Sequence, residues 1–80
     1  MRVRREVCGY DRETEWQVWS IPIDDGSVRS LAPLLGTEDD EDLVHVYDLE
    51  GRALDEAARL AGFRPRPDLD YTLEAFAPEG

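Results

Sequence analysis

Lysine and asparagine are absent from this 80-residue sequence, and cysteine, histidine and methionine each occur once. The single cysteine, Cys8, excludes a disulfide within the chain. One cysteine and one histidine, His45, are too few for a zinc site, which usually takes four protein ligands. We therefore expect a domain with no disulfide framework, no metal and no cofactor.

Long apolar segments are also lacking. A membrane helix needs about 20 consecutive apolar residues, and no stretch approaches that length. The opening MRVRREV is not followed by the apolar region of a signal peptide. We therefore expect a cytoplasmic protein with no membrane partner. The absence of Lys and Asn, together with abundant Ala, Arg, Gly and Asp, suggests a high-GC genome, either bacterial or haloarchaeal.

Negative charge is abundant: 19 Asp and Glu stand against nine Arg, giving a net charge of -10. Residues 37–80 hold 13 acidic residues and 4 Arg, so they account for -9 of the total. The densest part is Glu38–Asp42, five carboxylates in a row. Charge of this kind disfavours nucleic acid and anionic membranes and favours basic protein surfaces. A solvated loop, or the general acidity of haloarchaeal proteins, is the alternative explanation.

The first 21 residues have the pattern of a β-hairpin, with Asp11–Thr14 as a type I turn. In that register the numbers of facing residues sum to 25, so Val7 faces Val18 and Gly9 faces Trp16. Trp19 then lies on the other face of the sheet. A one-residue slip would exchange the two faces and make Trp16 the exposed tryptophan.

Four further elements follow the hairpin. Ser27 is a plausible N-cap of a helix that stops at Gly36, although Pro33 should make it short, kinked or partly 3₁₀. The other three elements are a strand over Leu43–Leu49, a helix over Gly51–Ala61 and a last strand over Tyr71–Ala77. Gly62 followed by Phe63 predicts a Schellman ending for the second helix.

This ββαβαβ order predicts an α+β fold in one small domain spanning residues 1–80. We expect about four strands in a mainly antiparallel sheet, with Leu43–Leu49 central and two helices on one face. The opposite face would be open. It would present Trp19, His45 and Tyr47 if Val18, Val44 and Val46 point to the helices.

No motif predicts a reaction. The acidic run lacks the glycine and glutamate positions of an EF-hand, and His45 has no Ser or Cys in a recognisable triad motif. Carboxylate pairs are inevitable among so many acids, and nothing indicates an apolar pocket that would raise one pKa. The charges of Arg2, Arg4 and Arg5 are largely cancelled by neighbouring acids, which argues against nucleic-acid binding. We expect a protein that is not an enzyme.

Three segments carry a resemblance: Arg5–Thr14, with its aromatic-Asp-x-Glu-Thr turn, the Leu43–Leu49 strand, and the ending Leu73–Ala77. Together they resemble a family of small acidic bacterial proteins of unknown function, over most of the chain. The motifs are structural, and the family has no assigned active residues to transfer. In general character the chain is also similar to immunity proteins of bacterial toxin systems, without a shared motif.

The leading hypothesis is therefore an acidic protein-binding domain, an immunity protein or inhibitor that occludes a basic toxin or nuclease. Acidic residues would steer the partner, and aromatic anchors would slow its release. The alternative is a structural or accessory domain that forms a homodimer through its sheet. DNA mimicry fits less well, because one five-residue run does not imitate a long row of phosphates. The predicted partner-binding residues are Trp19, Glu38, Asp39, Asp40, Glu41, Asp42, His45 and Tyr47.

Overall fold

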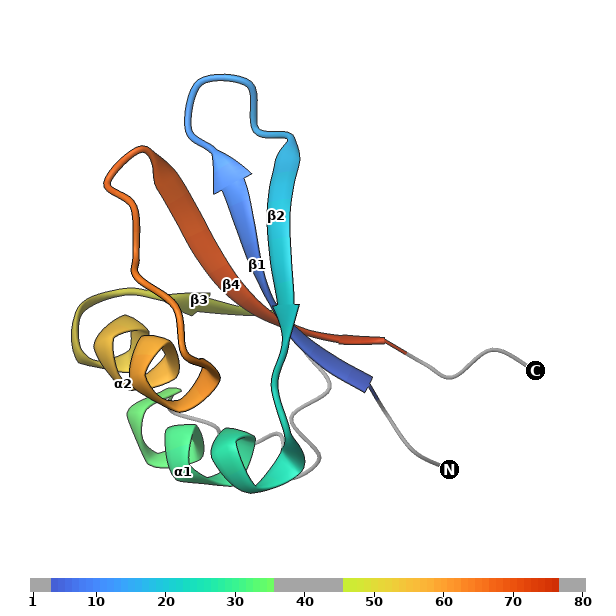
Figure 1. Ribbon diagram of the computed structural model, residues 1–80, viewed down its shortest axis with the longest axis vertical. Coiled ribbons are helices and arrows are strands. Elements are labelled where there is room, and N and C mark those ends of the chain that lie inside the picture. The colour runs from blue at the N-terminus through green and yellow to red at the C-terminus, as the bar shows by residue number, and fades with distance from the viewer. Residues whose placement is uncertain (1–3, 36–45, 77–80) are drawn as a thin grey trace.

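The computed structural model describes residues 4–35 and 46–76 (Figure 1). Its elements follow the predicted order ββαβαβ. The chain forms β1 (Arg4–Asp11), β2 (Gln17–Pro22), α1 (Asp25–Leu35), β3 (Tyr47–Leu49), α2 (Gly51–Ala61) and β4 (Leu69–Phe76). The α+β class is confirmed.

The four strands form one antiparallel sheet in the order β2-β1-β4-β3. The last strand of the chain, β4, thus lies beside β1 in the middle of the sheet. The predicted central position of the strand at 43–49 is wrong, because β3 is a three-residue strand beside β4 at the end of this order. Val46 precedes β3 and is 61% exposed, and residues 43–45 lie outside the described part of the chain.

The hairpin register also differs from the prediction. Asp11 closes the loop with Trp16, through an N–H···O=C bond of 2.9 Å, so the loop is two residues longer than the predicted turn. A register shift of two residues leaves each side chain on the same face of the strand. The bulge at Val18 shifts the register by one residue more. Gly9 therefore faces Trp19, and the numbers of facing residues sum to 28 beyond the bulge. This odd shift turns Trp19 to the face opposite to the predicted one.

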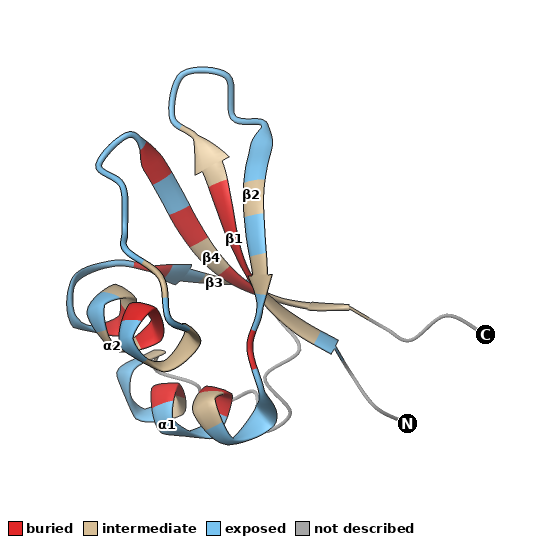
Figure 2. Ribbon diagram, in the orientation of Figure 1, coloured by how far each residue is buried: buried red, intermediate tan, exposed pale blue. Residues whose placement is uncertain are grey.

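The core lies between one face of the sheet and the two helices (Figure 2). Alternate residues of the two middle strands point into it, among them Val7, Leu73 and Tyr71, each at most 5% exposed. The helices contribute fully or nearly fully buried residues, including Leu31 of α1 and Ala57 of α2. The prediction that both helices cover one face of the sheet is confirmed.

Local signals explain the helix ends. The Asp24 carboxylate accepts hydrogen bonds from the N–H of Ser27, at 2.7 Å, and from its hydroxyl, at 3.1 Å. Asp24 therefore caps α1, and Ser27, the predicted N-cap, lies inside the first turn. Helix α1 continues two residues past the exposed Pro33. Helix α2 ends as predicted: Gly62 has φ +79°, and the N–H groups of Gly62 and Phe63 both bond to Ala58.

Candidate functional site

The predicted aromatic anchors lie on the covered face of the sheet. The ring of Trp19 is 4.9 Å from that of Phe63 and 5.8 Å from that of Tyr71, between centroids. Tyr47 is half-buried and packs against the core, opposite Leu73. The prediction that these two aromatic side chains stand on an open sheet face is therefore wrong. For Trp19 the reason is the bulge, which reverses the parity of β2, and Tyr47 stands on β3 opposite the buried Leu73. The other predicted residues, Glu38–Asp42 and His45, lie outside the described part of the chain.

The opposite sheet face holds a polar cluster on β1 and β4. The hydroxyls of Tyr10 and Thr72 both donate to the Glu74 carboxylate, the second at 2.7 Å. Glu6 lies on the same face and pairs with Arg4, at 3.2 Å. Cys8 lies among these groups and has no exposed surface. The cluster therefore surrounds a thiol with carboxylates.

Neither acidic donor of this cluster ionises at neutral pH. Burial, together with the negative charges of Glu74 and Glu6, raises the pKa of Cys8 from 9.0 to about 12. The hydrogen bond that Tyr10 donates to Glu74, together with burial, raises the pKa of that phenol to about 12. A thiol nucleophile must be a thiolate in contact with its substrate. This arrangement stabilises the protonated, buried thiol and gives it no such role.

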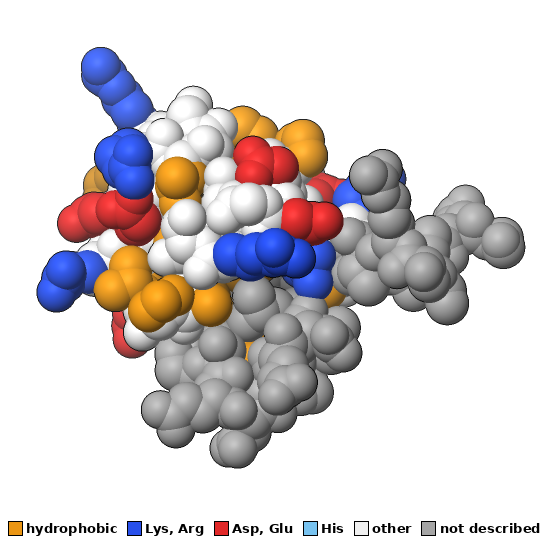
Figure 3. All heavy atoms as spheres, turned by 90° about the horizontal axis from the view of Figure 1, so that it is seen from below, with side chains coloured by type: hydrophobic (Ala, Val, Ile, Leu, Met, Phe, Trp, Pro, Cys, Tyr) orange, Lys and Arg blue, Asp and Glu red, His pale blue; other side chains and the backbone are white. Residues whose placement is uncertain are grey.

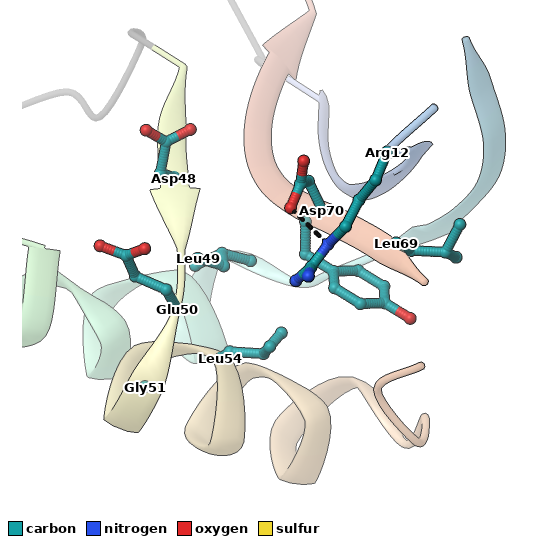
Figure 4. Close-up of a pocket in the computed structure, with 9 residues that line it drawn as sticks. Arg12, Asp48, Leu49, Glu50, Gly51, Leu54, Leu69 and Asp70 are labelled. Atoms are coloured by element: carbon teal, nitrogen blue, oxygen red, sulfur yellow. Dashed lines mark ion pairs between the residues drawn. The ribbon is translucent and has the colours of Figure 1, made fainter. Parts of the chain in front are cut away.

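A hollow of about 450 Å³ lies where β3 passes into α2, facing the first residues of β4 (Figure 4). Leu49 and Leu54 lie between its two sides in the close-up. On one side, Arg12 reaches from the hairpin loop to Asp70, with 3.0 Å between Nε and Oδ1. On the other side stand Asp48 and Glu50.

The charges lining the hollow are unequal. Asp48, Glu50 and Asp70 are carboxylates, and Arg12 is the single cation among the lining residues. Arg12 pairs with Asp70, whereas no ion pair joins Asp48 or Glu50 to the described arginines. Glu50 precedes α2, yet its side chain does not cap the helix. Chemically, the hollow can accept a cationic group beside these two exposed carboxylates.

Sequence reasoning placed no binding role at the β1–β2 hairpin end, where two of the large exposed apolar side chains of the described residues lie. Trp16 is 74% exposed and Val18 is 56% exposed. Both belong to the uncharged stretch 16–23, in a chain of which 35% is charged. This uncharged stretch was the feature of the sequence that could have indicated an exposed apolar surface. Its side-chain directions could not be assigned without the loop length and the bulge.

The described surface otherwise carries both signs of charge. Arg and Asp or Glu side chains lie interspersed on the face shown in Figure 3, with no extended area of one sign. Within the described residues, no three His, Cys, Asp or Glu side chains are arranged to hold a metal ion. No helix in this part of the chain has the length and apolar character to cross a bilayer.

Comparison with known proteins gives one match. A family model covers residues 4–74, from the first described strand to within two residues of the end of β4. No curated protein and no solved structure matches the chain. The match agrees with the resemblance to a family of unknown function. It says nothing of toxin immunity or of bacterial origin. Since it spans most of the chain, this protein belongs to the family described as Domain of unknown function (DUF7683).

Proposed function

We propose that this domain binds a basic protein and has no catalytic activity of its own. The observation that carries the proposal is the acidic hollow, where Asp48 and Glu50 face solvent without an arginine partner among the described residues. A cationic side chain of the partner could form charge-assisted hydrogen bonds with these carboxylates. The net charge of -10 would add long-range attraction to such a partner.

The state of the potential nucleophile supports a binding role. Cys8 is buried, and its raised pKa keeps it protonated at neutral pH. A thiol in this state neither attacks a substrate nor holds a metal. We therefore assign the polar cluster around Cys8 a structural role in the sheet and expect the exposed groups to contact the partner.

The finer role that we propose is inhibition of a basic enzyme, such as a nuclease toxin, by occlusion. A nuclease presents cationic side chains to nucleic-acid phosphates. An acidic domain can cover the same side chains. Electrostatic attraction would speed the encounter, and exposed apolar residues would slow dissociation.

The experiment is capture of partners from the source cell, followed by binding kinetics with the purified partner. We expect a protein of net positive charge. We expect its association rate constant to fall about tenfold or more between about 50 and 500 mM NaCl. An acidic partner, or an association rate that does not change with salt, would contradict the proposal.

A pair of variants tests the hollow itself. Asp48→Asn with Glu50→Gln removes two charges from the hollow. Asp55→Asn with Asp68→Asn removes two charges from residues that do not line it. We expect the first pair to weaken binding several-fold more than the second, although both change the net charge equally. If the partner is an enzyme, its activity should fall when it is mixed with the wild-type domain.

A further inference from the structure

Strand β2 lies at the end of the strand order, and its one neighbour in the described sheet is β1. Natural proteins usually protect such an edge with charged side chains, proline or a bulge. Here Val18 forms a bulge and Pro22 ends the strand, but residues 16–23 carry no charge. Between these two points the edge lacks the charged side chains that usually prevent pairing with another strand.

The backbone of Ser20 points away from the sheet. The Ile23 N–H donates to the Arg5 carbonyl at 3.1 Å, which sets the alternation of hydrogen-bonded pairs along β1 and β2. Ile21, two residues before Ile23, therefore also bonds to β1. Ser20, between two such positions, directs its N–H and C=O away from β1. Pro22 directs only a carbonyl outward, because proline has no N–H. An added strand would find two acceptors and one donor here.

Exposed apolar side chains accompany this edge. Trp16 is 74% exposed immediately before β2, and Val18 is 56% exposed within it. Tryptophan is enriched among residues that dominate binding energy. Backbone pairing with Ser20 and side-chain contact with Trp16 would act together, as in other cases of strand addition.

Carboxylates stand at both ends of β2. Glu13 and Glu15 lie in the loop before it, and Asp24 and Asp25 follow it; all four are exposed. Asp25 pairs with Arg5 at 2.7 Å, yet 66% of its side chain remains exposed. A second copy of this chain would bring acidic ends against acidic ends in either strand direction. An extended segment with basic residues at its ends would instead meet opposite charge.

We propose that β2 is a docking edge for an extended segment of the basic partner. The segment would add a fifth strand beside Ser20, rest an apolar residue against Trp16 or Val18, and place Arg or Lys near the flanking carboxylates. This proposal depends on the proposed function for the charge of the partner. It goes further in naming the surface, the backbone conformation and the spacing. Six strand residues span roughly 20 Å, so the basic groups should be about that far apart.

Two synthetic peptides test this proposal. The strand probe is a blocked eight-residue peptide with Val-Thr-Val-Thr in the middle and two Arg at each end. The control probe has the same charge, but two of its central residues are proline and cannot donate hydrogen bonds. At about 20 mM salt, where attraction is little screened, we expect the control to bind at least about tenfold more weakly. The strand probe should also slow hydrogen exchange of the Ser20 amide about tenfold or more.

Variants of the chain give an independent test. Trp16→Ala should weaken binding of the strand probe by about tenfold. Val46→Ala removes an apolar side chain that is 61% exposed and lies outside β2, and it should leave binding unchanged. Both positions are exposed, so circular dichroism should show both variants folded.

The outcomes separate this proposal from the proposed function. Equal binding of the two peptides overturns strand addition and leaves an electrostatic partner possible. No binding of the strand probe also overturns strand addition, whereas the capture experiment tests the basic partner independently. A stable dimer in light scattering that Trp16→Ala dissociates would overturn the proposal as well, because a second copy would then occupy the edge.

Discussion

Gly9 lies in the middle of β1, beneath two aromatic rings. A Cβ at this position would stand 3.4 Å from atoms of Trp19 and Tyr71 and 3.2 Å from Leu69 Cδ1. Position 9 therefore requires glycine, because the aromatic rings of neighbouring strands occupy the space that a side chain would take. The sequence predicted a tryptophan over this glycine correctly, but it assigned Trp16 to the role that Trp19 holds.

We expect Gly9→Ala to lower the free energy of unfolding by about 1–3 kcal/mol, because the added methyl group overpacks the core. Gly26→Ala is the matched control. The added Cβ there meets only the Asp24 carboxylate at 3.3 Å, and alanine favours the helix. Urea unfolding measures both. Equal losses for the two variants would show that ring packing over Gly9 is not the cause.

Cys8 should be protected from alkylation. Its pKa of about 12 lies three units above the ordinary 9.0, so the thiolate fraction at pH 8 is about 1,000-fold lower. Burial slows the reaction further. Iodoacetamide labelling followed by mass spectrometry should show this protection in buffer and its loss in concentrated urea. Comparable labelling rates in both solvents would refute the buried, protonated state.

At the scale of elements, α1 has one face in the core although Pro33 lies within it. Leu31 is fully buried, whereas Leu34, one turn later, is 39% exposed. Pro33 stands in the last turn, where its missing N–H removes one hydrogen bond and leaves the earlier turns intact. Val28, three residues before Leu31, is buried on the same face.

We expect Leu31→Ala to lower the free energy of unfolding by about 2–5 kcal/mol, because it leaves a cavity between α1 and the sheet. Leu34→Ala should change it by about 0.5 kcal/mol or less, because that side chain is partly solvated. Thermal unfolding followed by circular dichroism compares the two. Similar losses would mean that the face of α1 toward the sheet is assigned wrongly.

The elements differ in how far the sequence predicted them. Helix α2 begins and ends at the predicted residues, Gly51 and Ala61, because its periodicity and its Gly62 ending are local signals. The sequence left Trp16 as the alternative to Trp19 for the exposed tryptophan. It did not predict the hollow at Asp48 and Glu50. Such a hollow brings together residues from the hairpin, β3 and β4. No local pattern records that arrangement.

At the scale of the whole molecule, repulsion among carboxylates opposes folding. The net charge is -10, and five of the described arginines already pair with carboxylates, which are Glu6, Asp25, Asp70, Glu56 and Asp68. The unpaired surplus therefore repels itself most strongly in the folded state, where the charges are closest together. Salt shortens the range of that repulsion.

We expect the Tm to rise by about 5 °C between about 20 and 500 mM NaCl, which corresponds to about 1 kcal/mol for a domain of this size. KCl should produce the same rise if screening is the cause. Differential scanning calorimetry gives the measurement. A Tm that falls with salt would show that the exposed ion pairs outweigh the repulsion.

The sequence by itself determined the order of the elements, the bounds and ending of α2, and the surplus of negative charge. Each depends on residues within a turn or two of one another, or on composition alone. The tertiary structure decided the face on which Trp19 lies and the place of β3 in the sheet. The face of Trp19 depends on loop length, a one-residue bulge and packing against Phe63 and Tyr71, which follow much later in the chain. The place of β3 depends on its pairing with β4, the last strand of the chain. A strand alternates every residue, so one inserted residue was enough to turn Trp19 to the covered face, whereas Trp16 precedes β2 and is 74% exposed.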